Sequence, residues 1–303
     1  MSSSVCNNFV ATVGTFDGLH RGHQQILQRL LNEASARHAQ ALVVTFDQHP
    51  RQVLGHLNDD FCLLSTHDER LNLLASSGVD KVQELTFTPD VASLSACQFL
   101  EQYLVNRFRV KTLLLGYDNS FGSRQNDDFD SLPVTADALG VELIRDTPFI
   151  FDGLPVSSTR IRRALALGDM SNVNAMLGRH YNVSGYVTKG RGVGRQLHFP
   201  TANIVLDDSL KALPAPGVYA VEVLYQGISY RGMANLGPCP TFDLSQSSFE
   251  VHLLDFEGDI YGQKLMVRFL HRLRDIRHFS SSDKLVAQLI EDKKQVYSLI
   301  HLS

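Results

Sequence analysis

The architecture expected for the first half of the chain follows from eleven consecutive residues near its start: Val13-Gly14-Thr15-Phe16-Asp17-Gly18-Leu19-His20-Arg21-Gly22-His23. An apolar run at 9–14 leads into this stretch. After it, apolar residues recur with helical spacing at Ile26, Leu27, Leu30, Leu31 and Ala34. We therefore predict a strand, a glycine-rich turn and a helix, in that order. The carboxyl end of a strand is where a parallel sheet binds its ligands.

The same alternation continues through the first half. Apolar runs predict further strands at 41–46, 82–85, 112–115 and 141–144, and helical spacing predicts helices at 68–76 and 96–108. Strands that alternate with helices favour parallel crossovers. The fold class expected here is α/β, with a Rossmann-like parallel sheet.

The second half changes to a period of two. Strands are predicted at 182–188, 218–224, 229–235, 249–254 and 265–270, separated by turns rich in glycine and proline. Short strands at this spacing suggest a small antiparallel β-barrel. A C-terminal helix should cover one face or end of it with Leu285, Val286, Leu289, Ile290, Val296, Leu299 and Ile300. We place the domains at 1–180 and 181–303.

Composition limits the classes of function. The chain has 303 residues, 44% of them apolar, and a net charge of −4, which excludes bulk disorder and leaves no global field to attract nucleic acid or anionic lipid. No apolar run approaches 18 residues and no basic residue precedes Arg21, so neither a membrane span nor a secretory signal is expected. The widely spaced cysteines Cys6, Cys62, Cys97 and Cys239 favour a reducing compartment, and we expect a cytoplasmic protein.

The glycines and histidines of the eleven-residue stretch suit a phosphate group. Gly14, Gly18 and Gly22 allow tight turns and close backbone approach, while His20 and His23 stand at a helix start, beside free N–H groups and the positive end of the helix dipole. Two other interpretations are open. The pair could be part of a metal site with Asp17, although zinc needs further ligands. Both histidines could also be simple capping or surface residues.

The whole stretch resembles the Gly-x-Phe-Asp-Gly-x-His-x-Gly-His signature of nucleotidylyltransferases, in particular the adenylyltransferase module of bacterial FAD synthetases. Segments 45–51, 116–122 and 157–162 agree with that family in the same order. The resemblance implies catalytic roles for His20 and His23 and flavin binding by Asp118 and Phe121. It implies nucleotide binding by Gly14, Phe16, Asp17, Gly22, Ser157, Ser158, Thr159, Arg160 and Arg162. Ser120 departs from the basic residue that relatives often carry.

Residues 157–162 have a chemistry that fits this role. Three hydroxyls stand at a helix start, and Arg160 and Arg162 place guanidinium groups in its first turn, where they could hold a leaving pyrophosphate. Taken alone, the same run would favour an ordinary helix cap with solvated arginines, but behind the histidine motif and in the expected order it favours the phosphate role.

A second glycine-rich run, Gly190-Arg191-Gly192-Val193-Gly194-Arg195, precedes Phe199-Pro200-Thr201-Ala202-Asn203. It is not a Walker A loop, and alone it would be typical of a flexible hairpin turn. The Pro-Thr-Ala-Asn string resembles the motif of riboflavin kinases. That resemblance implies that Thr201 and Asn203 hold ATP and its Mg²⁺, that Gly190 and Gly194 bind nucleotide, and that Asn235 binds flavin.

The strand predicted at 249–254 carries the last candidate. Period two places Phe249, Val251 and Leu253 on one face and Glu250 and His252 on the other. An exposed glutamate is usually just solvated, but the resemblance implies that Glu250 is the general base for the riboflavin 5′-hydroxyl. His198 and Cys239 depart from the family pattern, which commonly has a glycine and a polar or basic residue there.

The resemblance spans about 10–300 and contains both motif sets in order. It implies a bacterial bifunctional riboflavin kinase/FMN adenylyltransferase that acts on riboflavin, FMN, FAD and ATP with Mg²⁺. The alternative is a riboflavin kinase with a weak or inactive adenylyltransferase domain. A flavin-binding regulator without turnover is a further possibility, although the residues that carry the chemistry are present. An RNA-binding regulator is disfavoured because no basic face with interleaved aromatics occurs.

Overall fold

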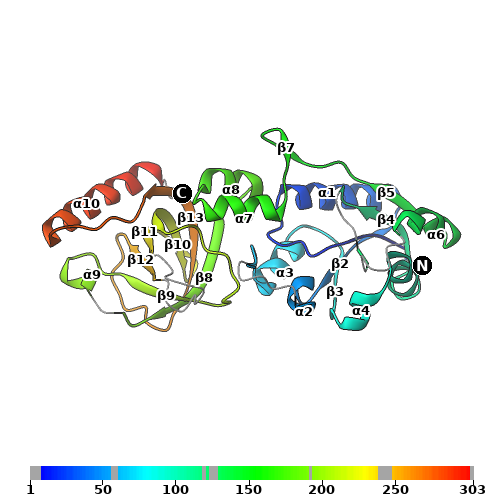
Figure 1. Ribbon diagram of the computed structural model, residues 1–303, viewed down its shortest axis with the longest axis horizontal. Helices are drawn as coiled ribbons and strands as arrows, with labels where there is room; N and C mark the ends of the chain where they lie inside the picture. Colours follow the sequence, from blue (N-terminus) through cyan, green and yellow to red (C-terminus); the bar gives the residue numbers. More distant parts are fainter. Residues whose placement is uncertain are drawn as a thin grey trace, which may run out of the picture. The chain divides into compact units, whose positions relative to one another are not determined.

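The computed structural model describes residues 8–55, 61–117, 121–122, 129–190, 193–237 and 248–300 of the chain (Figure 1). The chain divides into two compact units, Met1–Ser158 and Thr159–Ser303. Helices α7 (Ser158–Ala166) and α8 (Met170–Leu177) lie between this division and the boundary that the sequence predicts near 180. The boundary near 180 therefore stays a prediction.

The first unit contains a five-stranded parallel sheet in the order β3-β2-β1-β4-β5. Its strands are β1 (Phe9–Val13), β2 (Gln40–Phe46), β3 (Lys81–Leu85), β4 (Val110–Leu115) and β5 (Glu142–Arg145). All five predicted strands are confirmed, as is the α/β class. Since β1 is the central strand, the turn after it lies at the middle of the carboxyl edge.

Helices cover both faces of this sheet. On one face, α1 (Arg21–Ala36) and α3 (His67–Ala75) bury Leu30 and Leu74 against strand residues such as Val43. On the other, α5 (Ala96–Phe99), the π-helix η1 (Leu100–Val105) and α6 (Leu132–Ala138) bury Phe99 and Leu104. Burial on both faces explains why the three inner strands, β2, β1 and β4, are nearly continuous apolar runs. The helix predicted at 96–108 is found as the short α-helix α5, which continues directly as the π-helix η1.

Several short elements of the first unit have no counterpart among the sequence predictions. They are α2 (Pro50–Val53), α4 (Pro89–Ser93), the 3₁₀ helix η3 (Phe129–Ser131), and the two-stranded pair β6 (Ile150–Phe151) and β7 (Leu154–Pro155). Each is too short to show a hydrophobic period.

The second unit is a closed antiparallel barrel with the strand order β10-β11-β12-β9-β8-β13. Its strands are β8 (Tyr181–Thr188), β9 (Ala202–Leu206), β10 (Gly217–Tyr225), β11 (Ile228–Leu236), β12 (Phe249–Leu253) and β13 (Lys264–Arg274). The predicted barrel is confirmed, but β9 was missing from the predicted strands. It begins within the Pro-Thr-Ala-Asn string, in which proline, alanine and asparagine are residue types depleted in strands.

Helix α10 (Ser282–Leu299) packs on this barrel through Val296, with the following Ile300 beside it. Asp292 is also buried and forms an ion pair with Arg274 of β13 at 2.7 Å. The C-terminal helix is thus confirmed, although Ile290 and Leu299 of its predicted apolar face are exposed.

Candidate active sites

The turn after β1 has an unusual backbone. Phe16 and Leu19 have φ values of 50° and 34°, and Gly18 between them has a φ of 75°. A Cβ at Gly18 would stand 2.9 Å from the side chain of Leu64, so a close approach also requires this glycine. Left-handed conformations at residues other than glycine are costly and cluster at functional sites.

Asp17 fixes this turn from inside. The side chain is buried, and its carboxylate accepts hydrogen bonds from the backbone amides of Leu64 at 3.0 Å and Ser65 at 3.0 Å. The hydroxyl of Ser65 in turn accepts the amide of Gly18 at 3.0 Å. The carboxylate therefore ties the motif to a segment 47 residues away. Nucleotide binding by Asp17 stays a prediction beside this anchoring role.

His20 and His23 lie together at the start of α1. His20 is the N-cap residue, and its Nδ1 accepts the backbone amide of His23 at 3.3 Å. The two rings stack with centroids 3.7 Å apart. Gly22 makes room for this arrangement, because a Cβ there would lie 3.2 Å from the His20 ring. Since Nδ1 accepts, the neutral His20 ring carries its proton on Nε2.

The remaining motif residues of this loop pack around the histidines. Phe16 is buried and meets His23 edge-on, with ring centroids 5.2 Å apart. Gly14 donates its amide to the carbonyl of Val44 at 3.1 Å, and a Cβ there would lie 3.3 Å from the Phe16 ring. Gly14 and Phe16 thus fix the part of the loop that precedes the histidine pair.

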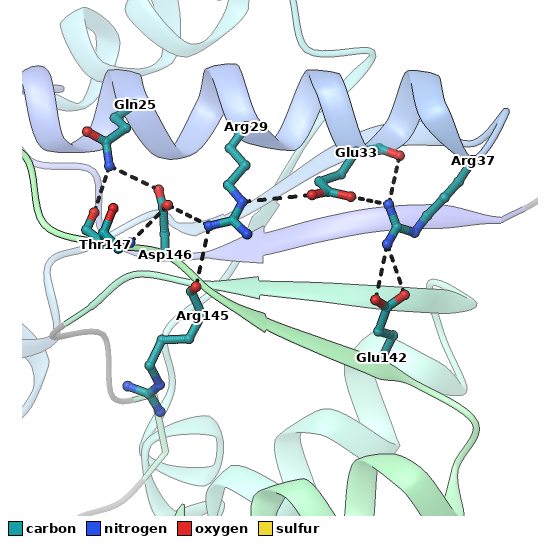
Figure 2. Close-up of polar contacts among 8 residues, drawn as sticks. All are labelled: Gln25, Arg29, Glu33, Arg37, Glu142, Arg145, Asp146 and Thr147. Atoms are coloured by element: carbon teal, nitrogen blue, oxygen red, sulfur yellow. Dashed lines mark hydrogen bonds and ion pairs between the residues drawn. The ribbon is translucent and has the colours of Figure 1, made fainter.

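Helix α1 is fastened to the end of β5 by a polar network (Figure 2). Arg29 donates to Asp146 at 2.8 Å, and Gln25 donates to the carbonyl of Thr147 at 2.6 Å. Asp146 is buried and directly follows β5. At the far end of the helix, Arg37 pairs with Glu142 of β5 at 3.0 Å. The network orients the helix whose first turn carries the histidines.

The end of β2 is held by a buried arginine. Arg70 of α3 donates to the carbonyls of Phe46 and Asp47, and Asp47 accepts the amide of Phe87 at 2.9 Å. Burial lowers the pKa of Arg70, while the nearby carboxylates, Asp17 first among them, oppose that shift. Segment 45–51 therefore carries structural contacts at the same edge of the sheet.

The predicted phosphate-binding run begins at the start of α7. Ser158 donates its hydroxyl to the carbonyl of Asp17 at 3.0 Å, which brings the run to the histidine turn at that point. Ser157 precedes the helix, whereas Thr159, Arg160 and Arg162 belong to α7 and fall in the second compact unit. Their nucleotide contacts stay predictions.

The flavin residues predicted in the first unit are only partly described. Asp118 and Ser120 lie outside the described residues. Phe121 is half-buried, and its ring lies 5.6 Å from that of Phe99. Gly122, with a φ of 93°, packs so closely on Ala96 that a Cβ would stand 2.5 Å from its amide nitrogen. A flavin role for Asp118 and Phe121 stays a prediction.

In the barrel, three predicted residues form one row across neighbouring strands. Glu250 of β12 is paired with Asn235 of β11 on one side and with Asn203 of β9 on the other. Directly opposite residues of an antiparallel ladder point to the same face. Phe249, Val251 and Leu253 are buried while Glu250 is half-buried, as period two predicts. The row therefore presents a carboxylate between two side-chain amides.

Thr201 completes this group. Its hydroxyl donates to Oε2 of Glu250 at 3.2 Å, a contact between residues 49 positions apart. The structure thus brings Thr201, Asn203, Asn235 and Glu250 together.

The glycine-rich run lies against the same group. A Cβ at Gly190 would stand 2.0 Å from the side-chain nitrogen of Asn203, and one at Gly194 would stand 2.3 Å from the carbonyl oxygen of Phe199. At Gly194 the neighbour is backbone, so only glycine allows this approach, whereas a Cβ at Gly190 would displace the Asn203 amide. Arg191 and Gly192 lie outside the described residues, as does Cys239.

The donor atoms of the barrel site suit a hard cation. Thr201 and Asn203 offer neutral oxygens beside the carboxylate of Glu250, and Mg²⁺ prefers oxygen ligands while keeping several waters or phosphate oxygens. Within the described ranges, no group of three histidine, cysteine or acidic residues is placed to hold a metal ion. A zinc site at His20 and His23 with Asp17 therefore finds no support there.

Two family models match the chain in this order: FAD synthetase over residues 2–160 and riboflavin kinase over residues 177–300. The bifunctional riboflavin kinase/FMN adenylyltransferase of Haemophilus influenzae is 36% identical over 292 residues, covering 96% of this chain and 94% of its own. The protein of the same name from Pseudomonas fluorescens is 38% identical over 290 residues, covering 93% and 90%.

A solved structure titled as a macrolide-efflux protein from Streptococcus pneumoniae is also similar. Its TM-score is 0.86 at 34% identity, covering 96% of this chain and 94% of that one. In the part of the present chain that the structure describes, no helix is both long enough and apolar enough to cross a membrane.

A parallel-sheet domain followed by a small closed barrel, matched in that order by the two family models, defines a two-domain transferase. The chain belongs to the bifunctional riboflavin kinase/FMN adenylyltransferase family and is an enzyme with a FAD synthetase domain and a riboflavin kinase domain. The presence of both domains favours the bifunctional interpretation over a kinase with an inactive appendage.

Proposed function

We propose a division of the chemistry between the two units. The barrel transfers the γ-phosphoryl group of ATP to the 5′-hydroxyl of riboflavin, which gives FMN and ADP. The parallel-sheet unit then transfers the AMP group of a second ATP to the FMN phosphate, which gives FAD and pyrophosphate.

The row of Asn203, Glu250 and Asn235, with Thr201 3.2 Å from the carboxylate, is the observation that carries the kinase half. Glu250 accepts the proton of the riboflavin hydroxyl as that oxygen attacks the γ-phosphorus. Asn235 binds the flavin, while Gly190 and Gly194 leave room for the nucleotide. Phosphoryl transfer depends mainly on positioning and charge neutralisation, which fits a site built from a few fixed polar groups.

Thr201 and Asn203 would hold Mg²⁺ together with the phosphates of ATP. When bound, the ion neutralises charge that develops on the transferred phosphoryl group. The oxygen donors of these two residues support this role, and Thr201 is already fixed beside Glu250.

For adenylyl transfer, His20 and His23 stabilise the phosphate oxygens of ATP. The hydrogen bond from the His23 amide to Nδ1 of His20 places the proton of the neutral ring on Nε2, and the rings lie at the positive end of α1. Gly14, Phe16, Asp17 and Gly22 shape this nucleotide site. The hydroxyls of Ser157 and Ser158 retain the leaving pyrophosphate, and Asp118 and Phe121 receive the flavin.

We further propose a cytoplasmic location, which the wide spacing of the cysteines supports. Small-molecule substrates, rather than nucleic acid, agree with the net charge of −4.

The division is tested by incubating the protein with riboflavin, ATP and Mg²⁺ and separating the flavins over time. FMN should appear first and FAD later. A His20→Ala/His23→Ala double variant should form FMN at the parental rate and no FAD. Equal loss of both products, in a variant that melts like the parent, would contradict separate sites, and FMN alone from the parent would favour the alternative kinase.

A further inference from the structure

A histidine outside the proposed chemistry lies next to the barrel site. His252 is on β12 two residues after Glu250, and therefore on the same face of the strand. Its Nδ1 is 2.6 Å from the carbonyl oxygen of Pro200, and its ring meets Phe199 edge-on with centroids 5.3 Å apart. The side chain thus holds the residue that immediately precedes Thr201.

The protonation of His252 follows from this contact. A carbonyl oxygen only accepts hydrogen bonds, so Nδ1 must carry a hydrogen. Burial lowers the pKa of His252 below its ordinary value, and the charge of Lys293 lowers it further, against the opposing effect of the Pro200 hydrogen bond. The ring is therefore neutral near pH 7, with its single N–H directed at Pro200.

The segment that His252 holds is also supported upstream, where Phe199 donates its amide to the carbonyl of Gly194 at 2.8 Å. The ladder between β9 and β12 pairs Ala202 with Val251 and Asn203 with Glu250. Pro200 and Thr201 lie just before the first of these pairs, and proline has no N–H to donate. Two positions upstream of Pro200, His198 has a left-handed φ of 61°. In the described part of the chain, consecutive residues 200 and 201 are thus held by His252 and Glu250, respectively.

We propose that His252 is a positioning residue for phosphoryl transfer: its Nδ1–H, bonded to the carbonyl of Pro200, sets the place of the Thr201 hydroxyl beside Glu250. This inference rests on the roles proposed above for Thr201 and Glu250. Strand β12 then supplies both the proton acceptor, Glu250, and the histidine that positions Thr201 beside it.

The rival explanation is that His252 serves only by packing against Phe199. Two variants separate the explanations. His252→Asn puts an amide N–H near the position of Nδ1 but removes the ring, whereas His252→Phe keeps a ring and has no donor. If the hydrogen bond positions Thr201, the Asn variant should retain FMN formation within about threefold of the parent and the Phe variant should lose about tenfold or more, because small displacements of reacting groups have large effects on rate.

The pattern of kinetic constants and of binding adds an independent readout. A displaced Thr201 should raise the KM for MgATP and weaken the binding of MgADP measured by calorimetry, in the Phe variant and not in the Asn variant. In a Thr201→Val background, His252→Phe should change the FMN rate by less than about threefold, since the residue it positions is already lost. FAD formation from supplied FMN monitors the other unit and should stay at the parental rate in every variant.

His252→Gln keeps the test decisive if the Phe variant unfolds in a thermal melt. Its amide reaches the position of Nε2 rather than Nδ1, so it should behave like Phe. Parental kinetics in a folded Phe or Gln variant, or loss in Asn with retention in Phe, would overturn the proposal. Glu250→Gln is assayed in parallel: if that variant keeps the parental FMN rate, the site assignment fails, which is distinguishable from failure of the His252 series alone.

Discussion

Asp17 and Glu250 are both motif carboxylates, yet their surroundings suit them to different work. Asp17 is 2% exposed and accepts backbone amides from two residues, so its oxygens are engaged in holding the turn. Glu250 is half-buried and accepts one side-chain hydroxyl, from Thr201. A carboxylate has about four acceptor positions, so Glu250 retains capacity for a substrate hydroxyl. Geometry thus favours Glu250 as the proton acceptor.

The backbone of His198 supports a prediction about stability. Its φ of 61° is a conformation that costs a non-glycine residue about 1–2 kcal/mol. His198→Gly removes this strain but adds about 0.4–1 kcal/mol of unfolded-state entropy. The free energy of unfolding should therefore stay within about 1 kcal/mol of the parent or rise slightly. His198→Val should lower it by more than about 1 kcal/mol, because branching at Cβ makes the left-handed region still less favourable.

Denaturant unfolding of the two variants checks this expectation. A glycine variant that is less stable than the valine variant would show that the side chain of His198, and not its backbone, is what matters. It would also remove the physical reason for the glycine that the family commonly has at this position.

At the scale of elements, the clamp between α1 and β5 should matter for adenylyl transfer. Asp146→Ala removes the buried acceptor of Arg29 and should lower the free energy of unfolding by about 1–2 kcal/mol. Because α1 carries the histidines, FAD formation from FMN should also fall, by about tenfold, since misplacement by 1 Å costs on the order of 10²-fold. FMN formation in the barrel should stay unchanged.

Arg37→Ala is the matched control. It breaks an ion pair between the same helix and β5, with Glu142, but at the end of α1 remote from the histidines. It should leave both flavin products at parental rates. If Arg37→Ala and Asp146→Ala slow FAD formation equally, the effect is one of general helix stability and not of histidine placement.

The elements also show what the sequence could predict. Strands β1, β2 and β4 were predictable because burial on both faces makes them nearly continuous apolar runs, and β12 because its burial alternates with period two. Strand β9 escaped because its ladder begins at Ala202, inside a string that looks like a loop. Its pairing with β12 depends on partners 47 residues or more away, which no local pattern encodes.

In the candidate sites, the motif residues were predictable from the sequence, but the residues that support them were not. The motif residues Thr201 and Glu250 do come together, as the family resemblance implies. The supports of these motifs were not predictable: Leu64 and Ser65 hold Asp17 through backbone amides, which carry no residue signature. The position of His252 on the face of Glu250 was visible from the period of the strand, but its contact with Pro200 needed the three-dimensional structure.

At the scale of the whole molecule, the second compact unit should work alone. It includes α7 and α8, and Asn174 of α8 donates to the carbonyl of Phe269 at 2.9 Å and accepts the amide of Tyr181 at 2.8 Å. A fragment of residues 159–303 should therefore fold. It should form FMN within about threefold of the parental rate and form no FAD.

A shorter fragment, residues 182–303, should be less stable. It loses the buried residues Val173, Met176 and Leu177 of α8, each worth about 1.5–3 kcal/mol. Thermal melts of the two fragments compare them directly. Equal melting temperatures would mean that α8 contributes nothing to the barrel, and FAD formation by either fragment would contradict the division of activities.

The measurement that bears most directly on the central claim is the rate of FMN formation by Glu250→Gln. Gln keeps the size of the side chain and its capacity to accept the Thr201 hydroxyl but does not take up a proton at neutral pH. The account predicts a fall of about 10²- to 10⁴-fold, with little change in MgADP binding and parental FAD formation from supplied FMN. A fall in the FMN rate of no more than about threefold is far smaller than the fall expected when a general base is lost. That result would contradict the claim that the row of Asn203, Glu250 and Asn235 is the kinase centre.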